Sequence, residues 1–328
     1  MKAAYYESIG PAAEVIRVGE RPTPQPAAGE VRIRVHTSGV NPSDVKSRAG
    51  SRGALTYPYV IPHSDGAGVI ESVGSTVDPA RVGERVWIWN AAWRRQFGSC
   101  AELLCLPSEQ AVPLPANTGF DAGACLGIPA MTACHAALGD GPLDGKTVLV
   151  TGGAGAVGHY AIQFARWSGA RVLATVSGAA KAQSAKAAGA HEVINYREQD
   201  VVAQVKERTA GAGVDRIIEV EFGGNLAVSN QVLKTGGTIA AYGSAAVPTP
   251  QLPFYPMMFN HSTVQMLLVY LLSASQRQRA CSLINEALVA GVLQHQIGER
   301  YALAETARAH LAVESGRVIG NVVVTVQG

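Results

Sequence analysis

A glycine-rich turn is the part of the sequence whose residue types and spacing most clearly suggest chemistry. Gly153, Gly155 and Gly158 form a GxGxxG pattern between the apolar run Thr147–Thr151 and the helix-forming run Ala156–Ser168. Glycines at this spacing allow a tight turn and let a pyrophosphate approach the backbone, while the helix amino terminus supplies free N–H groups. Because a strand precedes the pattern and a helix follows it, we predict a dinucleotide-binding turn rather than an ordinary glycine-rich βα connection.

The stretch after this turn lacks the carboxylate with which NAD-preferring folds bind the ribose 2′-hydroxyl. No Asp or Glu lies between Asp144 and Glu192, and Lys181 follows a second apolar run that ends near Ser177. A carboxylate would repel a 2′-phosphate, whereas a hydroxyl and a lysine would bind it. The sequence therefore favours NADPH over NADH; the alternative is that Lys181 only solvates a helix face.

Two patterns of secondary structure must position these residues. From Thr147 onward, apolar strand-length runs alternate with helix-length segments, which is typical of a parallel sheet built from βαβ units. The expected strands are Thr147–Thr151, Arg171–Thr175, Glu192–Asn195, Arg216–Val220 and Thr238–Tyr242. In the first third, short runs alternate polar and apolar residues between Gly/Pro turns, which indicates antiparallel sheet or barrel. Near the carboxyl end we expect helices at Gln276–Ala290 and Ala304–Glu314 and a closing strand at Asn321–Val326.

The composition describes a folded and sparsely charged chain. Its 328 residues are 47% hydrophobic and only 16% charged, with a formal net charge of +2. This excludes intrinsic disorder and gives no strong attraction to nucleic acid or to an anionic membrane. Five cysteines without a CxxC pair argue against a disulfide framework and a Cys-rich zinc site. With no signal peptide and no apolar run of ~18–20 residues, we expect a soluble, cytoplasmic protein.

Six segments, taken in order, carry a resemblance to a known family. They are Gly39–Asp44, Ser64–Ile70, Gly127–Ala133, the glycine turn, Gly189–Glu198 and Gly236–Ser244. The chain resembles, over essentially its whole length, the zinc-free quinone oxidoreductases (zeta-crystallin type) of the medium-chain dehydrogenase/reductase superfamily. The resemblance implies an α/β protein with a β-rich, GroES-like catalytic domain and a Rossmann cofactor domain with a doubly wound parallel sheet. Residues 1–124 would begin the catalytic domain, 125–264 would form the NADPH-binding Rossmann domain, and 265–328 would complete the catalytic domain.

The same resemblance implies which residues bind the cofactor. They are Thr132, Gly153, Gly155, Ala156, Val157, Gly158, Ser177, Lys181, Tyr196, Gly243, Ser244 and Asn321. Ser177, Lys181 and Tyr196 would contact the NADPH 2′-phosphate, in agreement with the missing carboxylate. Thr132 would lie near the nicotinamide carboxamide, and Gly243–Ser244 along the nicotinamide ribose.

The resemblance also implies a site without metal. Zinc members of the superfamily carry a cysteine where this sequence has Asn41 and a ligand histidine where it has Ser64, and an amide with a hydroxyl cannot replace that set. Asn41, Lys46 and Arg52 are the candidate substrate-pocket residues, since members often show tyrosines where Lys46 and Arg52 stand; His63 also departs from the family pattern. The two cations would either face an oxyanion or acidic substrate, or point into solvent.

The predicted activity follows from this chemistry. Hydride attack on a quinone or enone yields a delocalised oxyanion that neighbouring donors can stabilise, so we predict an NADPH-dependent, zinc-independent quinone oxidoreductase using direct hydride transfer. Two alternatives stay open: a 2-enoyl thioester or alkenal reductase of the same superfamily, and an NADPH-binding structural or regulatory protein without turnover. Thr263–Tyr270 has strand propensity at the expected sheet edge, so we expect a homodimer or a multiple of one.

Overall fold

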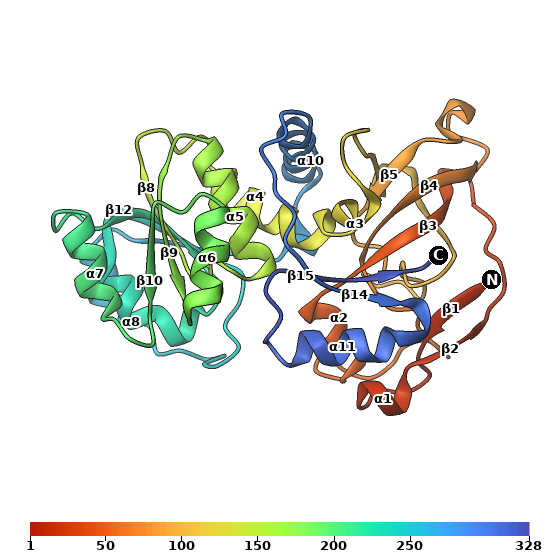
Figure 1. Cartoon of the computed structure of the whole chain (residues 1–328), viewed down its shortest axis with the longest axis horizontal. Helices are drawn as coiled ribbons and strands as arrows, with labels where there is room; N and C mark the ends of the chain where they lie inside the picture. The colour runs from red at the N-terminus through yellow and green to blue at the C-terminus, as the bar shows by residue number, and fades with distance from the viewer. Residues whose placement is uncertain (328) are drawn as a thin grey trace. The chain divides into compact units, whose positions relative to one another are not determined.

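The computed structural model describes residues 1–327, and the chain divides into two compact units, many of whose elements are labelled in Figure 1. Unit 1 comprises Met1–Ile128, Asn285–Gly291 and the chain from His295 onward; unit 2 comprises Pro129–Ile284 and Val292–Gln294. The units therefore divide after Ile128 and again inside helix α10 (Ala274–Val289). The domain boundaries expected after residues 124 and 264 stay a prediction.

Unit 2 contains, within the described residues, a six-stranded parallel sheet in the order β10-β9-β8-β11-β12-β13. Its strands are β8 (Thr147–Val150), β9 (Arg171–Val176), β10 (Glu192–Asn195), β11 (Val214–Glu219), β12 (Leu233–Ala241) and β13 (Thr263–Met266). The chain starts at the central β8, runs outward to β10, returns to β11 and continues outward to β13. That reversal of order defines a doubly wound Rossmann sheet, and the predicted fold class is confirmed.

Helix α4 (Met131–Leu138) precedes the first strand of this sheet, and the other helices join its strands. They are α5 (Ala156–Trp167), α6 (Ala179–Ala187), α7 (Val201–Arg208), α8 (Phe222–Val232) and α9 (Phe254–Phe259). The strands are apolar because both sheet faces are covered: Leu149 and Ile217 lie on one face and Val148 and Ile218 on the other, and all four are at most 1% exposed. Short helices lie at Leu126–Ala130, a π-helix, and at Val269–Leu271.

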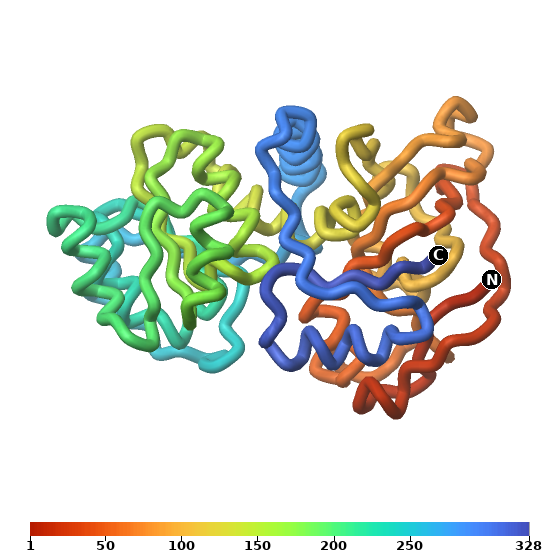
Figure 2. Tube along the Cα trace, in the orientation of Figure 1, coloured from red at the N-terminus to blue at the C-terminus, as the bar shows by residue number. Residues whose placement is uncertain are grey.

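Unit 1 contains a mainly antiparallel sheet in the order β14-β15-β3-β4-β5-β7, with β6 paired to β3 and a separate β1–β2 ladder. The strands are β1 (Lys2–Tyr5), β2 (Arg17–Glu20), β3 (Glu30–Val40), β4 (Asp65–Val73), β5 (Arg85–Ile88), β6 (Leu103–Pro107), β7 (Ala111–Pro113), β14 (Ile297–Ala302) and β15 (Asn321–Thr325). The carboxyl-terminal β15 pairs with β3 from the first part of the chain, as the two ends of the colour scale in Figure 2 show. The carboxyl-terminal segment therefore completes the GroES-like sheet.

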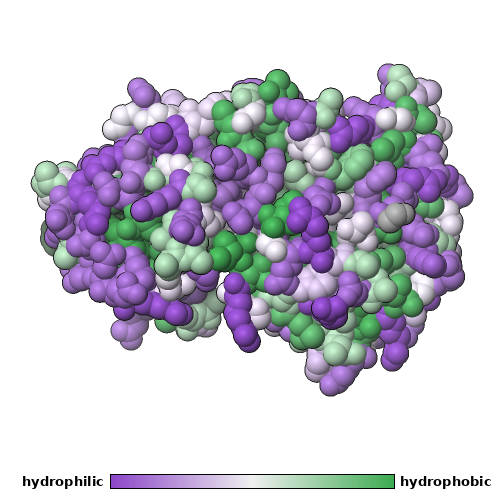
Figure 3. All heavy atoms as spheres, in the orientation of Figure 1, coloured by the Kyte–Doolittle hydropathy of each residue, from purple (hydrophilic) through white to green (hydrophobic). Residues whose placement is uncertain are grey.

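The helices of unit 1 are short and lie around this sheet. They are α1 (Ala12–Val15), α2 (Pro42–Arg48), α3 (Phe120–Gly123), α11 (Thr306–Glu314) and 3-10 turns at Pro79–Arg81, Ser108–Gln110 and Leu303–Glu305. The five cysteines, all within the described residues, are free. On the face drawn in Figure 3, apolar residues form several separate groups among polar ones. No helix among residues 1–327 is both long and apolar enough to span a membrane.

A buried pair of imidazoles joins β3, the chain before β4, and α11. Nε2 of His63 lies 3.0 Å from Nε2 of His310, and Nδ1 of His63 lies 2.8 Å from Oγ of Ser38. Both imidazoles are inaccessible to solvent. Desolvation, with a smaller contribution from Arg48, lowers the pKa of His310 to about 3. Desolvation, followed by His310, lowers the pKa of His63 well below its ordinary value.

This pair makes unit 1 sensitive to acid. Because the folded pKa of His310 lies below the unfolded value, its contribution to stability is complete above pH 6.5 and is lost as the pH falls towards 3, by about 2 kcal/mol at pH 5. Asp44 and Asp65 have raised pKa values, so their contributions to stability change with pH in the opposite direction. The test therefore compares the wild type with a variant that lacks only the His310 imidazole. We expect the free energy of unfolding of His310→Gln, measured by urea denaturation, to fall less steeply below pH 6.5 than that of the wild type. Equal slopes would contradict the assignment.

Candidate functional site

The glycine turn lies between the end of β8 and the start of α5. Gly152 has a φ of +65°, in the left-handed region that favours glycine. A Cβ atom on Gly158 would lie 2.3 Å from the carbonyl oxygen of Gly152, and one on Gly153 would lie 2.8 Å from Cβ of Ala174 in β9. Helix α5 therefore approaches the turn and the sheet more closely than any side chain at these two positions would allow.

The amino terminus of α5 is open for a ligand. Gly155 is its N-cap, with an ordinary φ of −76°, and no side chain among the described residues caps it by a hydrogen bond. A Cβ on Gly155 would meet nothing nearer than 3.4 Å, so the need for glycine here is not set by the protein's own packing. Ala156 and Val157 are the first helical residues, and their N–H groups belong to the set that has no partner within a helix. This cradle fits a dinucleotide pyrophosphate.

The three residues predicted for the 2′-phosphate lie near the carboxyl ends of the neighbouring strands β9 and β10. Ser177 directly follows β9, Tyr196 directly follows β10, and Lys181 lies in the first turns of α6. Asn195 pairs with Val176, and the N–H of Tyr196 donates to the carbonyl of Val176 at 3.1 Å, so the ends of the two strands are adjacent. The side chain of Tyr196 is 51% exposed and is available to a ligand.

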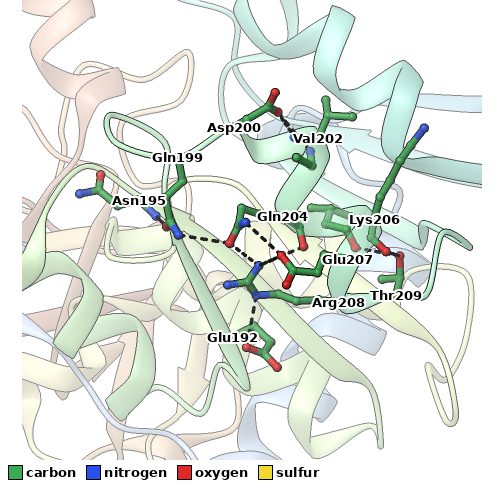
Figure 4. A network of polar contacts seen from close by, with 12 residues as sticks. Glu192, Asn195, Gln199, Asp200, Val202, Gln204, Lys206, Glu207, Arg208 and Thr209 are labelled. Carbon is green, nitrogen blue, oxygen red and sulfur yellow. Dashed lines mark hydrogen bonds and ion pairs between the residues drawn. The ribbon is translucent and has the colours of Figure 1, made fainter.

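Local polar contacts hold the turn that follows β10, as Figure 4 shows for Asn195, Gln199 and Asp200. The N–H of Asn195 donates to Oε1 of Gln199 at 2.9 Å. Oδ1 of Asp200 accepts the N–H of Val202 at 2.8 Å and so caps α7. The turn after β10 is thus fixed at its start by Gln199 and at its end by the helix cap.

On the other side of β8, a cavity of about 300 Å³ opens at the carboxyl ends of β12 and β13. Its lining residues are Phe222, Ala241, Tyr242, Gly243, Ser244, Pro248, Pro250, Met266, Leu267 and Leu268, and none carries a charge. Gly243 and Ser244, predicted for the nicotinamide ribose, are among them. Since β8 lies between β9 and β11, a dinucleotide with its pyrophosphate on the glycine turn would reach the Ser177 edge with one half and this cavity with the other. Thr132 is 4% exposed in α4 and does not line the cavity.

Unit 1 places Asn41 between two buried carboxyl groups. The N–H of Asn41 donates to Oδ2 of Asp44 at 2.8 Å, and its Nδ2 donates to Oδ2 of Asp65 at 2.8 Å. Asp65 also accepts the N–H of Ile128 at 2.9 Å. Desolvation raises the pKa of Asp44 to about 7 and that of Asp65 well above its usual range. Sequence reasoning missed both partners, although an Asn followed three residues later by an Asp is a helix-start signal.

The remaining candidates of unit 1 occupy different environments. Lys46 and Arg52 are exposed, and the guanidinium carbon of Arg52 lies 6.0 Å from the centre of the Trp93 ring, which Arg94 also approaches at 5.3 Å. Asn321 is 6% exposed, and its Nδ2 donates to the carbonyl of Gln296 at 3.0 Å. His63, which the sequence left unplaced, belongs to the buried imidazole pair.

The described residues hold no zinc donor set. Within 1–327, no three His, Cys, Asp or Glu side chains gather as they do around a metal ion. Ser64 is 2% exposed and Asn41 is 4% exposed, and their hydroxyl and amide oxygens are poor zinc ligands. The residues present therefore do not fit a catalytic zinc centre.

Comparison with known proteins supports the class that the fold and the glycine turn define. A family model described as the alcohol dehydrogenase GroES-like domain matches residues 27–116, and one described as zinc-binding dehydrogenase matches residues 156–286. A GroES-like sheet joined to a Rossmann sheet is the plan of a medium-chain dehydrogenase/reductase, so the chain is an oxidoreductase of that superfamily.

Individual relatives narrow the family. The quinone oxidoreductase of Rattus norvegicus is 32% identical over 293 residues, 88% of this chain and 86% of that protein. The 2-haloacrylate reductase of a Burkholderia species is 31% identical over 325 residues, 96% of this chain and 94% of that one. The crystal structure of Escherichia coli quinone oxidoreductase complexed with NADPH superposes with a TM-score of 0.87 at 25% identity, covering 99% of this chain and 100% of that chain. The chain belongs to the quinone oxidoreductase family of the medium-chain dehydrogenase/reductase superfamily.

The glycine turn yields a prediction that separates folding from binding. Gly158→Ala forces a methyl group against the Gly152 carbonyl, so we expect it to lower the free energy of unfolding by about 1–3 kcal/mol. Gly155→Ala meets no such contact but places a methyl group where the pyrophosphate approaches. We expect Gly155→Ala to lower the melting temperature less than Gly158→Ala does, since only the N-cap preference for glycine over alanine is lost, and to weaken NADPH binding about tenfold. Thermal unfolding without cofactor and fluorescence titration measure the two effects. Equal stability of the two variants would contradict the packing argument.

Proposed function

We propose that this chain is an NADPH-dependent reductase that transfers hydride directly to a quinone or another conjugated carbonyl. One observation carries the proposal: the glycine turn after β8 lies between two features of the sheet. On one side, near the carboxyl end of β9, are Ser177 and Lys181; on the other is the uncharged cavity at the ends of β12 and β13. The first suits the 2′-phosphate of NADPH, and the second suits a nicotinamide ring and a planar, uncharged acceptor. The E. coli quinone oxidoreductase, whose structure is a complex with NADPH, supports the same cofactor.

The residues of this chain supply binding and orientation. Bound NADPH would provide the hydride. The amino terminus of α5 would bind the pyrophosphate, and the buried apolar lining by Phe222 and Ala241 would exclude water from the nicotinamide half. Nδ2 of Asn41 donates to Asp65 and the same side chain bonds Asp44, so Asn41 would hold the two buried carboxyl groups of unit 1 in place.

A separate observation favours a second class of hydride acceptor, the conjugated acids and related enoyl compounds. The Burkholderia relative is a 2-haloacrylate reductase by name, and Lys46, Arg52 and Arg94 supply exposed positive charge in unit 1. A conjugated acid, or the enoyl thioesters and alkenals of the same superfamily, therefore stands as the alternative substrate. Steady-state assays with naphthoquinone, a simple enone and a carboxylated enone distinguish these classes. We expect naphthoquinone to be reduced fastest; NADPH binding without turnover of any acceptor would contradict the reductase and favour a structural or regulatory protein.

The cofactor preference has its own test. We expect Lys181→Ala to weaken NADPH binding about tenfold and to leave NADH binding unchanged, because it removes one charge-assisted hydrogen bond to the 2′-phosphate. Lys186→Ala, on the exposed end of the same helix α6, is the matched control. Calorimetric titration of the three proteins with both cofactors measures the effect. An unchanged NADPH preference in Lys181→Ala would overturn the phosphate site.

The exposed outermost strand of the sheet, β13, supports a proposed homodimer or a multiple of it. β13 is the last strand in the sheet order, and Met266 and Leu268 are 70% and 43% exposed. An exposed apolar edge strand is a hazard unless it pairs. We expect light scattering at micromolar concentration to give at least twice the monomer mass of 34.2 kDa. A monomer would count against pairing through β13.

A further inference from the structure

One wall of the cavity is a loop that has little packing to hold it. Residues 244–250, between β12 and α9, form neither helix nor strand, yet Ser244, Pro248 and Pro250 line the cavity. Ala245, Ala246 and Val247 are exposed, so this part of the loop buries little apolar surface. Ordering it costs conformational entropy that hydrophobic contacts do not offset.

Hydrogen bonds to one carboxylate replace that packing. The oxygens of Glu221 accept the N–H of Ala245 at 2.7 Å, of Ala246 at 3.0 Å and of Val247 at 3.3 Å. Oγ of Ser244 accepts the N–H of Gly223 at 2.9 Å and donates to the carbonyl of Val247 at 2.6 Å. Hydrogen bonds to an ionised acceptor are about twice as strong as neutral ones, so Glu221 is the main anchor of the loop.

Glu221 is itself fixed through a buried neighbour. Its N–H donates to Oε1 of Glu219 at 2.6 Å, and the same oxygen accepts Oγ1–H of Thr151 at 2.8 Å. Glu219 is fully buried, and Thr151 directly precedes Gly152 of the glycine turn. A continuous path of hydrogen bonds therefore runs from the dinucleotide turn, through Glu219 and Glu221, to the loop that walls the cavity.

We propose that Glu221 is a positioning residue for the nicotinamide half of the cofactor, because its carboxylate holds residues 244–250 in the conformation that forms the cavity. The proposal rests on the proposed nicotinamide cofactor and adds a residue that touches no reacting atom. Burial alone would raise the pKa of Glu221, but the N–H groups of Ala246, Ala245 and Val247 outweigh it and lower the pKa, so the anchor stays charged at neutral pH.

The test separates the two halves of the cofactor. Glu221→Gln keeps the size of the side chain and removes its charge, and Glu207→Gln, an exposed glutamate on α7, is the matched control. Calorimetry with NADPH reports on both halves, whereas 2′,5′-ADP reports only on the adenosine half. We expect Glu221→Gln to bind NADPH about tenfold more weakly, to bind 2′,5′-ADP as the wild type does, and to exchange the amide hydrogens of residues 245–247 about tenfold faster.

Each other outcome has a definite meaning. Equal weakening of NADPH and 2′,5′-ADP binding would show general damage to unit 2 and would overturn the positioning role. Wild-type protein that binds NADPH, with a Glu221→Gln variant that binds it equally well, overturns the role of Glu221 alone. Wild-type protein that binds neither molecule overturns the proposed function, while faster amide exchange in the variant would still support the anchoring of the loop by Glu221.

Discussion

The close approach of helix α5 to the end of β8 is the contact on which the rest of unit 2 depends. It exists because Gly158 carries no side chain: a single methyl group on Gly158 would lie 2.3 Å from the carbonyl oxygen of Gly152. This contact directs the amino terminus of α5 towards the carboxyl edge of the sheet, where a dinucleotide binds in doubly wound folds. The ends of β9 and β10 and the ends of β12 and β13 then lie to its two sides.

The distribution of charged residues near the carboxyl ends of these strands cannot be inferred from the net charge of the chain. No carboxylate occurs in residues 145–191, which include the end of β9. Glu219, at the end of β11, and Glu221 have oxygens engaged by internal donors: the hydroxyl of Thr151 for the first and backbone N–H groups of the 245–247 loop for the second. Negative charge near the cofactor site is thus used to hold the protein's own backbone, and the cavity lining stays uncharged.

Local signals in the sequence were sufficient to predict the main strands and helices of the molecule. The run Glu192–Asn195 is β10 with the expected bounds, and the helix expected at Ala156–Ser168 is α5, one residue shorter. These elements have clear periodicity or flanking glycines, and such signals act over a few residues. Contacts between distant residues left no such signal: His63 and His310 are 247 positions apart, and Asp65 reaches Asn41 only because β3 and β4 pair.

The site was predictable where it coincides with a motif and not where it depends on a loop. Gly153, Gly155 and Gly158 could be found from spacing, since the chemistry of the turn requires glycine there. Glu221 follows β11 in a stretch without periodicity, and only the folded chain brings it to residues 245–247. Lys46 and Arg52 differ again, because exposed cations look alike in sequence whether or not a ligand lies near them.

Direct hydride transfer from NADPH is the central claim, and isotope transfer tests it most directly. The enzyme would oxidise NADPH that is deuterated at the transferring position of C4, with a simple enone as the acceptor. An enone is chosen because deuterium delivered to carbon is retained in the product. We predict one deuterium at the β-carbon of the saturated ketone, from one face of the nicotinamide only. Product without deuterium, formed while the NADPH is consumed, would contradict direct transfer.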